Sequence, residues 1–261
     1  MSKHITVTGL DKSYGDSKVL DDVSFSIEPG EFVSLVGPSG CGKSTVLEMI
    51  GGLKAPDAGS ITVEGEEVTG PREGTGIIFQ ETATLPWRNT LDNVSLSLEV
   101  RGVPKAERQA AARKAIASVG LQGFERHFPA QLSGGMRQRV SIARVLTTSP
   151  EIILADEPFG ALDEQTRLIV ALEFLSAVAQ TSAAVLFVTH SIQESVLLSD
   201  RVLIMGARPG RIIDEVRIDV AKPRGPELIG SAELNGYSDR IWTSLRDEVQ
   251  RAWDMQGRGH E

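Results

Sequence analysis

The stretch GPSGCGKST, residues 37–45, constrains the fold of this chain more than any other. It fits the pattern G-x-x-x-x-G-K-[S/T], in which glycines let the backbone wrap around phosphate groups with amide N–H groups pointing inward. An apolar stretch, residues 32–36, precedes the motif, and helix-forming residues follow it. This order predicts a buried strand, a phosphate-binding loop and a helix whose positive N-terminus faces the phosphates.

The motif predicts a nucleotide site and a role for several of its side chains. We expect Lys43 to reach the outer phosphates and the Ser44 hydroxyl to bind Mg²⁺. Cys41 is expected to fill space between two glycines, with a somewhat acidic thiol because Lys43 and backbone amides lie nearby. The predicted ATP-binding residues of the loop are Gly37, Pro38, Ser39, Gly40, Cys41, Gly42, Lys43, Ser44 and Thr45.

Composition excludes several classes of protein. Acidic residues outnumber basic ones, 35 to 27, and a net charge of −8 argues against a nucleic-acid surface. A single cysteine excludes an internal disulfide framework and a cysteine-cluster metal site. The N-terminus lacks the apolar segment of a signal peptide, and no run approaches the ~18 apolar residues of a membrane span. These features predict a soluble, cytosolic protein.

The order of strand and helix patterns predicts an α/β fold. The N-terminal third resembles antiparallel strands, with Val23, Phe25 and Ile27 alternating with polar residues. Strand patterns at 152–155 and 185–188, with a helix between them, predict a mixed, mainly parallel sheet. The remaining predictions are a helix at 45–53, a helical insert at 90–147, a hairpin at 202–216 turning at 208–210, an irregular stretch at 218–238, and a last helix carrying Trp242, Leu245, Val249 and Trp253 on one face.

Polar side chains follow three of the predicted strands. Asp156 and Glu157 end one strand, His190 ends another, and Gln80 ends a shorter strand at 76–80. Ligands of open α/β sheets bind beyond the carboxyl ends of the strands. We therefore expect Asp156 to hold Mg²⁺, Glu157 to polarise the attacking water, and His190 to contact the γ-phosphate. Gln80 is either a plain polar residue at the sheet edge or a residue whose amide oxygen serves Mg²⁺ or water.

A second anion site is predicted at QLSGGMRQRVSIAR, residues 131–144. Ser133 is placed as a helix cap, and Gly134 and Gly135 leave the first turn without side chains. Met136, Val140 and Ala143 are expected on one face of this helix, and Arg137, Ser141 and Arg144 on another. Taken alone, the stretch is better explained as a glycine pair before an ordinary packed helix.

The ordered set of motifs resembles the ATP-binding subunit of ABC transporters over nearly the whole chain. The matching segments are the Walker A motif at 37–45, the Q-loop at Gln80, the signature at 132–136, Walker B at 152–157, the D-loop at 160–163 and the switch histidine His190. The resemblance implies an ATPase in which Glu157, His190 and Lys43 are catalytic, and in which Tyr14 stacks on adenine. A surface tyrosine of a strand is the alternative interpretation of Tyr14.

The family architecture implies a P-loop core, an antiparallel β subdomain and a helical insert. We expect the core at 1–85 and 148–220, the helical subdomain at 86–147 and a C-terminal segment at 221–261. The resemblance also implies a homodimer, in which Ser133, Gly134, Gly135 and Asp163 contact the ATP of the partner subunit. Met136 departs from the usual glutamine of the signature, so a polar contact is lost there.

Several stretches are similar to the ATPase subunits of nitrate, sulfonate and taurine importers. They are TLPWRNTLDNV, LSGGMRQRVSIAR, ADEPFGALDEQTR and ARPGRI. That branch implies two permease subunits, a periplasmic binding protein, and a peripheral position on the cytoplasmic face of a bacterial inner membrane. Trp87 is predicted either to dock on a permease or to lie in the core. The alternatives to a transport ATPase are a soluble ABC ATPase of DNA repair or translation and a small-molecule kinase.

Overall fold

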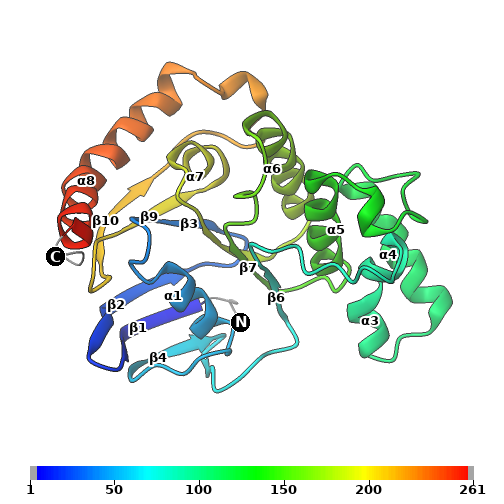
Figure 1. Cartoon of the computed structure of the whole chain (residues 1–261), viewed down its shortest axis with the longest axis horizontal. Coiled ribbons are helices and arrows are strands. Elements are labelled where there is room, and N and C mark those ends of the chain that lie inside the picture. Colours follow the sequence, from blue (N-terminus) through cyan, green and yellow to red (C-terminus); the bar gives the residue numbers. More distant parts are fainter. Residues whose placement is uncertain (1–4, 258–261) are drawn as a thin grey trace. The chain divides into compact units, whose positions relative to one another are not determined.

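The computed structural model of the chain describes residues 5–257, with side chains described as far as Arg251. These residues form two compact units. One contains the chain up to Arg72 and from Ala184 onward, and the other is Glu73–Ala183. Figure 1 labels helices and strands of both units where there is room.

An antiparallel sheet opens the first unit. Its strands are β1 (Ile5–Tyr14), β2 (Ser17–Ile27), β4 (Ala58–Val63) and β5 (Glu66–Glu67), in the order β2-β1-β4-β5. Val23 and Ile27 of β2 are fully buried, and Phe25 is half-buried. The alternating pattern of the sequence therefore predicted this strand and its inward face correctly.

A second sheet of the first unit is centred on β3 (Phe32–Val36), which is buried along its whole length. The strands β8 (Ala184–Val188) and β9 (Arg201–Met205) flank it in parallel, and β10 (Ile212–Arg217) adds an antiparallel edge. β9 and β10 form the predicted hairpin. The unit also contains α1 (Lys43–Ile50) and α7 (Ile192–Leu198), so the predicted helix at 45–53 begins and ends earlier than expected.

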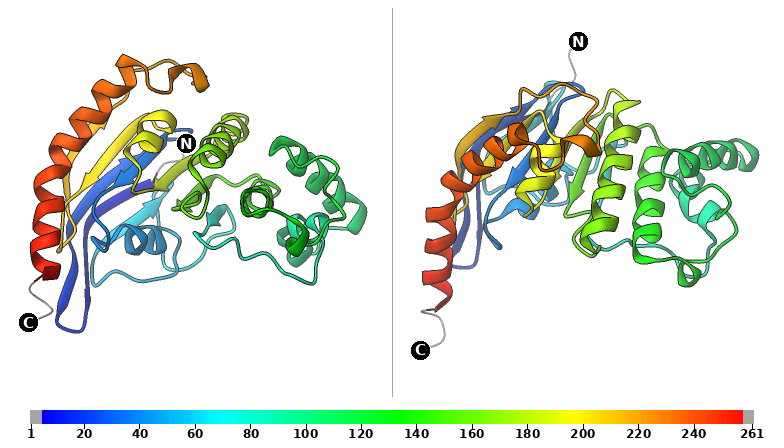
Figure 2. Two further views of the ribbon diagram at one scale, coloured as in Figure 1. Left: turned by 45° about the horizontal axis from the view of Figure 1, so that its top comes forward. Right: turned by 90° about the horizontal axis from the view of Figure 1, so that it is seen from above.

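The C-terminal part departs from the prediction. A short 3-10 turn, η2 (Pro226–Leu228), precedes α8 (Ala232–Gly257), so the irregular stretch ends well before residue 238. Figures 1 and 2 show α8 running beside β9 and β10. The buried face of α8 carries Leu234, Ile241 and Leu245, whereas Trp242 is 51% exposed. The predicted apolar face is therefore wrong at Trp242, and the side chain of Trp253 lies outside the described residues.

The second unit joins a parallel strand pair to a group of helices. β6 (Thr75–Ile78) pairs with β7 (Ile152–Asp156). The helices are α2 (Thr90–Val94), α3 (Leu96–Val100), α4 (Lys105–Ser118), η1 (Pro129–Gln131), α5 (Gly134–Leu146) and α6 (Glu164–Ala179). Figure 2 shows α4 and α5 from two directions. The predicted helical character of 90–147 is confirmed, and the proposed subdomain 86–147 lies wholly within this unit.

Each unit has aromatic contacts in its own core. Phe32 and Phe187 meet in the first unit, and Phe159 and Phe174 meet edge to face in the second. Within the part of the chain that the structure describes, no helix combines the length and apolarity needed to cross a bilayer.

Candidate functional site

The loop between β3 and α1 has the form that phosphate binding requires. The buried strand β3 fixes one end of the loop, and α1 begins at Lys43. Gly42 has φ of 105°, and a Cβ there would lie 2.5 Å from Leu20 Cδ2, so only glycine fits. The first turn of α1 has no side-chain cap and no acidic residue. Such a helix N-terminus directs backbone donors and a positive dipole end at an anion.

Lys43 places a buried positive charge over this loop. Lys43 is only 6% exposed. Its Nζ donates hydrogen bonds to the carbonyl oxygens of Gly37, at 2.9 Å, and Pro38, at 3.0 Å. Ser39, Gly40 and Ser44 are exposed around it, so the outer side of the loop and the start of α1 are open to a ligand.

Cys41 differs from its predicted chemistry. The residue is 2% exposed, and burial raises the pKa of its thiol. The nearby charge of Lys43, with its Nζ 3.9 Å from Sγ, acts in the opposite direction but is the smaller effect. The expected acidic thiol is therefore wrong, because desolvation of the thiolate outweighs the attraction of the cation. The interpretation of Cys41 as a space-filling residue agrees with its burial.

Two further predicted residues lie at strand ends of the first unit. Tyr14 ends β1 and is 45% exposed, with the ammonium groups of Lys12 and Lys54 at 5.8 and 5.4 Å from its ring centroid. An exposed, electron-rich ring of this kind offers a face for stacking. His190 lies two residues after the end of β8 and is exposed. Ser191 then caps α7 by accepting a hydrogen bond from the Glu194 amide.

The polar residues of the second unit converge beyond the ends of β6 and β7. Ile78 of β6 pairs with Ala155 of β7, so Gln80 and Glu157 follow their strands at equivalent positions. A methyl group on Gly160 would lie 3.7 Å from both Gln80 Nε2 and Glu157 Oε2. The side chains of Gln80 and Glu157 therefore both end next to Gly160. Asp156, the last residue of β7, is half-buried beside them in the sequence.

Glu157 adopts a strained backbone conformation. Its φ of 43° lies in the left-handed region, which costs a residue other than glycine on the order of 1 kcal/mol or more. The Gly160 amide donates to the Glu157 carbonyl oxygen at 3.0 Å, which closes the turn. Strain of this kind is concentrated at functional sites, where it aims a side chain.

The predicted cap at Ser133 is confirmed, but the two glycines after it differ in their role. The Ser133 hydroxyl accepts a hydrogen bond from the Met136 amide at 3.2 Å. Gly134 is exposed, and a Cβ there would meet nothing closer than 3.9 Å. Gly135 is buried, and a Cβ there would lie 2.6 Å from Thr166 Cγ2 of α6. Close packing of α5 on α6 therefore requires Gly135, while only Ser133 and Gly134 remain open to a ligand.

The predicted faces of α5 are correct only in part. Val140 and Ala143 are buried as expected, and Met136 is half-buried. Ser141 was expected on the other face, with Arg137 and Arg144, yet it is 7% exposed. The α5 helix is covered on more than one side because it packs against α2, α4 and α6.

Comparison with known proteins identifies the family of this chain. The family model described as ABC transporter matches residues 20–160, which is more than half of the chain. The chain belongs to the ABC transporter ATP-binding proteins. The cassette is 48% identical over 235 residues to an uncharacterized ABC transporter ATP-binding protein of Methanocaldococcus jannaschii, covering 90% of this chain and 87% of that protein.

Two other relatives carry more specific descriptions. The taurine import ATP-binding protein TauB of Yersinia pestis is 42% identical over 215 residues, which are 82% of this chain and 84% of that protein. A solved dimeric ATP-binding cassette in a post-hydrolysis state, bound to ADP and Pi, shares 31% identity with a TM-score of 0.73. It covers 83% of this chain and 100% of that chain. The cassette therefore has the ABC ATPase fold and is an ATPase.

Asp163 already has a structural task in the cassette. Its carboxylate caps α6 by accepting a hydrogen bond from the Thr166 amide at 3.0 Å, and this bond lowers the pKa of the carboxyl. Asp163 remains exposed, so a ligand at this helix start is accessible to it. Sequence reasoning assigned Asp163 by family resemblance alone and did not anticipate the cap.

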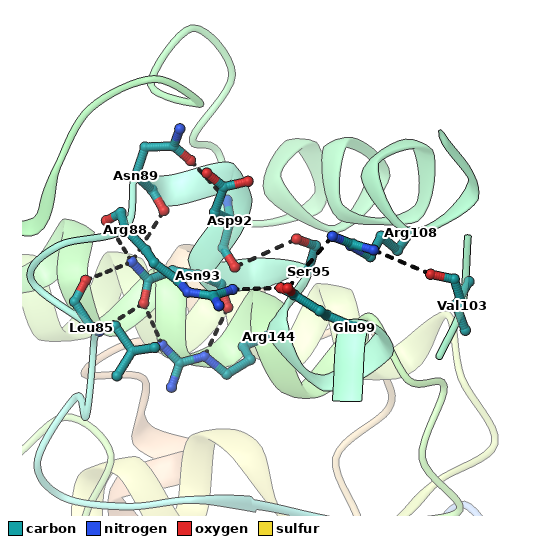
Figure 3. Close-up of polar contacts among 10 residues, drawn as sticks. All are labelled: Leu85, Arg88, Asn89, Asp92, Asn93, Ser95, Glu99, Val103, Arg108 and Arg144. Atoms are coloured by element: carbon teal, nitrogen blue, oxygen red, sulfur yellow. Dashed lines mark hydrogen bonds and ion pairs between the residues drawn. The ribbon is translucent and has the colours of Figure 1, made fainter. Parts of the chain in front are cut away.

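Trp87 lies on the surface of the second unit, so the core alternative is wrong. It is 72% exposed. The loop that carries it is fixed by Asn93, a fully buried residue whose Nδ2 donates to the carbonyl oxygens of Leu85, Arg88 and Asn89 (Figure 3). Sequence reasoning missed Asn93, because a single asparagine within a helical pattern carries no signal of burial.

Arg144 connects the same loop to the end of α5. Its guanidinium donates to the Asn93 carbonyl oxygen at 3.0 Å and to Asn93 Oδ1 at 2.9 Å (Figure 3). It also donates to the Ala83 carbonyl oxygen at 3.0 Å. The Trp87 loop and the helix that begins at the signature are thus joined by charge-assisted hydrogen bonds. The sequence placed Arg144 on a helix face but gave no indication of this contact.

Proposed function

We propose that the cassette binds MgATP between two copies of the chain and uses ATP hydrolysis to drive an ABC importer for a small anion. Taurine, another sulfonate and nitrate are the candidate solutes. The observation that carries this proposal is the 42% identity to a taurine import ATP-binding protein over most of both chains. The taurine import protein of Pseudomonas aeruginosa supports it at 40% identity over 231 residues.

Nucleotide binding is assigned to the loop and helix start at residues 37–45. The backbone amides and the α1 dipole would hold the phosphates, and Lys43 would exchange its contacts with Gly37 and Pro38 for phosphate oxygens. Tyr14 would stack on the adenine, because its exposed ring offers an apolar face. His190 would contact the γ-phosphate from the end of β8.

The residues present fit a magnesium ion. Ser44, Gln80 and Asp156 offer hydroxyl, amide and carboxylate oxygens, which are the ligands that Mg²⁺ prefers. When bound, Mg²⁺ neutralises charge that develops on the phosphates. Glu157 would orient the attacking water and accept its proton, and the convergence of Gln80 and Glu157 above Gly160 supports this role.

The proposed partners are a second copy of the cassette, two permease subunits and, indirectly, a periplasmic binding protein. Ser133 and Gly134 would contact the ATP of the partner subunit from an exposed helix start, and Asp163 from another. Gly135 would contribute by allowing α5 to approach α6. Trp87 would face the permease, on the cytoplasmic side of the inner membrane. Nucleic acid is not an expected partner of this acidic chain.

Two substitutions separate binding from hydrolysis. Lys43→Ala should abolish high-affinity ATP binding, because it removes the buried positive charge that we assign to the phosphates. Glu157→Gln should keep ATP binding and reduce turnover at least ~100-fold, because the amide cannot accept the proton of the attacking water. Equilibrium binding of a fluorescent ATP analogue and phosphate release measure the two effects. A Glu157→Gln protein that turns over at the wild-type rate would remove Glu157 from this role.

A further inference from the structure

The loop that joins β9 to β10 packs against the phosphate loop of the same unit. We call residues 206–211 the backing loop. The Gly206 amide donates to the Arg211 carbonyl oxygen at 2.9 Å, which closes the loop. Gly210 is tied to β2 on both sides, because its amide donates to the Val19 carbonyl oxygen and its carbonyl oxygen accepts from the Asp21 amide. The backing loop is therefore held at both ends.

Two residues of the backing loop contact two successive carbonyl groups of the phosphate loop. Arg208 Nε donates to the Gly40 carbonyl oxygen at 2.8 Å. Gly210 lies so close to the Cys41 carbonyl group that a Cβ at Gly210 would be 1.9 Å from that oxygen. No side chain other than hydrogen fits at Gly210 without displacing one of the two loops.

These contacts also fix the donors of the phosphate loop. In a trans peptide the C=O and N–H groups point in opposite directions. Arg208 holds the Gly40 carbonyl oxygen on one side of the loop, so the Cys41 N–H of the same peptide points to the other side. Gly210 backs the Cys41 carbonyl oxygen in the same way, so the Gly42 N–H also points to the other side. The Cys41 N–H donates to the Pro38 carbonyl oxygen at 3.4 Å, a long hydrogen bond that it would exchange for one to a phosphate oxygen.

The C-terminal helix α8 also holds the start of the backing loop, at Ala207. The Ala207 amide donates to Glu248 Oε2 of α8 at 2.7 Å, and Glu248 is only 8% exposed. Arg251 donates to the other oxygen of the same carboxylate at 2.5 Å. A buried, charge-assisted hydrogen bond therefore fixes Ala207, the residue directly before Arg208.

We propose that Arg208 is a positioning residue for nucleotide binding: it holds the Gly40 peptide, with Gly210 backing the Cys41 peptide, so that the loop amides face the phosphates. Arg208 is exposed, so its contribution is made through the Gly40 carbonyl group and not through the core. The inference rests on the proposed assignment of residues 37–45 to the nucleotide.

Substitution of Arg208 tests the inference in the full-length protein, with a fluorescent ADP analogue as the probe. Arg208→Ala should weaken ADP binding about tenfold, which is about 1.4 kcal/mol, and raise KM for ATP more than it lowers kcat. Thermal melting should be unchanged because the side chain is exposed. Arg208→Lys should recover most of the affinity, because an ammonium can still donate to the Gly40 oxygen. Arg211→Ala, an exposed arginine of the same loop, is the matched control and should bind as the wild type does.

A second variant moves the loop without removing the charge. Gly210→Ala should weaken ADP binding and expose Cys41 to alkylation, because the added methyl group displaces the backing loop from the Cys41 carbonyl group. Cys41 is the sole cysteine of the chain, so labelling reports on this loop alone. An unchanged labelling rate and unchanged affinity in Gly210→Ala would contradict the proposal.

Lys43→Ala distinguishes the failure of this inference from failure of the site assignment. If Lys43→Ala loses ADP binding while Arg208→Ala changes it less than about twofold, the role of Arg208 is wrong and the site stands. Equal weakening of ADP binding by Arg208→Ala and Arg211→Ala would mean that any nearby positive charge has the same effect. That result would also overturn the proposed role of Arg208. If Lys43→Ala binds ADP as tightly as the wild type, the assignment of residues 37–45 fails and the role of Arg208 fails with it.

Discussion

Cys41 shows how burial decides the chemistry of a side chain next to a cation. Lys43 favours the thiolate, yet the thiol is 2% exposed, and the lost hydration of the thiolate raises the pKa. A thiol whose pKa is higher in the folded than in the unfolded protein favours folding at low pH. That contribution is complete below the ordinary thiol pKa of 9.0 and is lost as the pH rises through the higher pKa of the folded protein.

Alkylation of Cys41 by iodoacetamide should therefore be slow at neutral pH and should accelerate only above the range of an ordinary thiol. Unfolding in urea should restore ordinary reactivity, and Cys41→Ser should abolish labelling because the chain has no other cysteine. The rate is measured by mass spectrometry between pH 7 and about pH 10. A folded-state rate that already reaches its plateau at pH 8 would contradict the raised pKa.

The sequence predicted the residues around Cys41 more accurately than their environment. The spacing of glycines with Lys43 is a property of the backbone pattern, and it located the loop between β3 and α1 correctly. Gly210 and Leu20 approach the loop at Cys41 and Gly42 from distant parts of the chain. A local pattern holds no information about such contacts, and Arg208 escaped notice for the same reason.

At the scale of elements, the signature helix α5 combines an exposed start with a tightly packed flank. Ser133 caps it and Gly134 is open, whereas Gly135 lies against Thr166 of α6. The sequence indicated the cap and the glycine pair. It could not separate the two glycines, because the distinction lies in the approach of α6.

Alanine at the two glycines should therefore have opposite effects on stability. Gly135→Ala should destabilise the cassette by roughly 1–3 kcal/mol, because the methyl group overlaps Thr166. Gly134→Ala should leave the stability unchanged or raise it by up to ~1 kcal/mol, because alanine favours the helix and meets open space. Urea unfolding of the two variants measures the difference. Equal free energies of unfolding would contradict the packing assigned to Gly135.

The loop with Trp87 presents an exposed aromatic side chain on a rigid support. The side-chain nitrogens of Asn93 and Arg144 donate hydrogen bonds to five main-chain oxygens and one side-chain oxygen around the loop. The main-chain oxygens belong to Ala83, Leu85, Arg88, Asn89 and Asn93, and the side-chain oxygen is Asn93 Oδ1. An exposed tryptophan on such a loop suits a partner interface, because no rearrangement is needed before docking.

Trp87→Ala should leave the melting temperature and ATP affinity of the isolated cassette unchanged, because the side chain is 72% exposed. It should weaken assembly with the permease subunits in membranes. Trp242→Ala is the matched control, since Trp242 is also exposed but lies on α8. Full assembly of the Trp87→Ala cassette with the permease would remove this loop from the interface, as would a loss of assembly equal to that of Trp242→Ala.

At the scale of the whole molecule, the cassette carries two helix starts that we propose as anion-binding sites, at different positions in the chain. One is the start of α1 in the first unit, and the other is the start of α5 in the second. We infer that the two serve different nucleotides, each shared with a partner subunit. The solved relative is dimeric and bound to ADP and Pi, which supports a dimer as the working state.

The fold class, the motif order and most elements followed from the sequence because each depends on local pattern. The strand β7 is a continuous apolar run that ends at a carboxylate, and α4 and α5 are helices of 14 and 13 residues. The face of α8 was misjudged because apolar spacing alone placed Trp242 inward, whereas the helix rests on Ile241 and Leu245. Tertiary contacts decide such faces, and they are absent from a single sequence.

The mixed-dimer experiment tests the sharing of ATP most directly. Lys43→Ala empties the phosphate loop of one chain, and Gly134→Asp places a carboxylate at the open start of α5 in the other. Gly134 is preferred to Gly135 because a side chain at 135 would collide with Thr166 and disturb the fold. Both chains also carry Glu157→Gln to slow turnover, and occluded ATP is counted after mixing.

Each parent dimer should occlude no ATP, since every one of its sites has a defect. In the mixed dimer, one site combines the intact loop of the Gly134→Asp chain with the intact α5 start of the Lys43→Ala chain. The account predicts occlusion of about one ATP per mixed dimer, with mixed dimers verified by tagged purification. Occlusion in verified mixed dimers no greater than in the parents would contradict it.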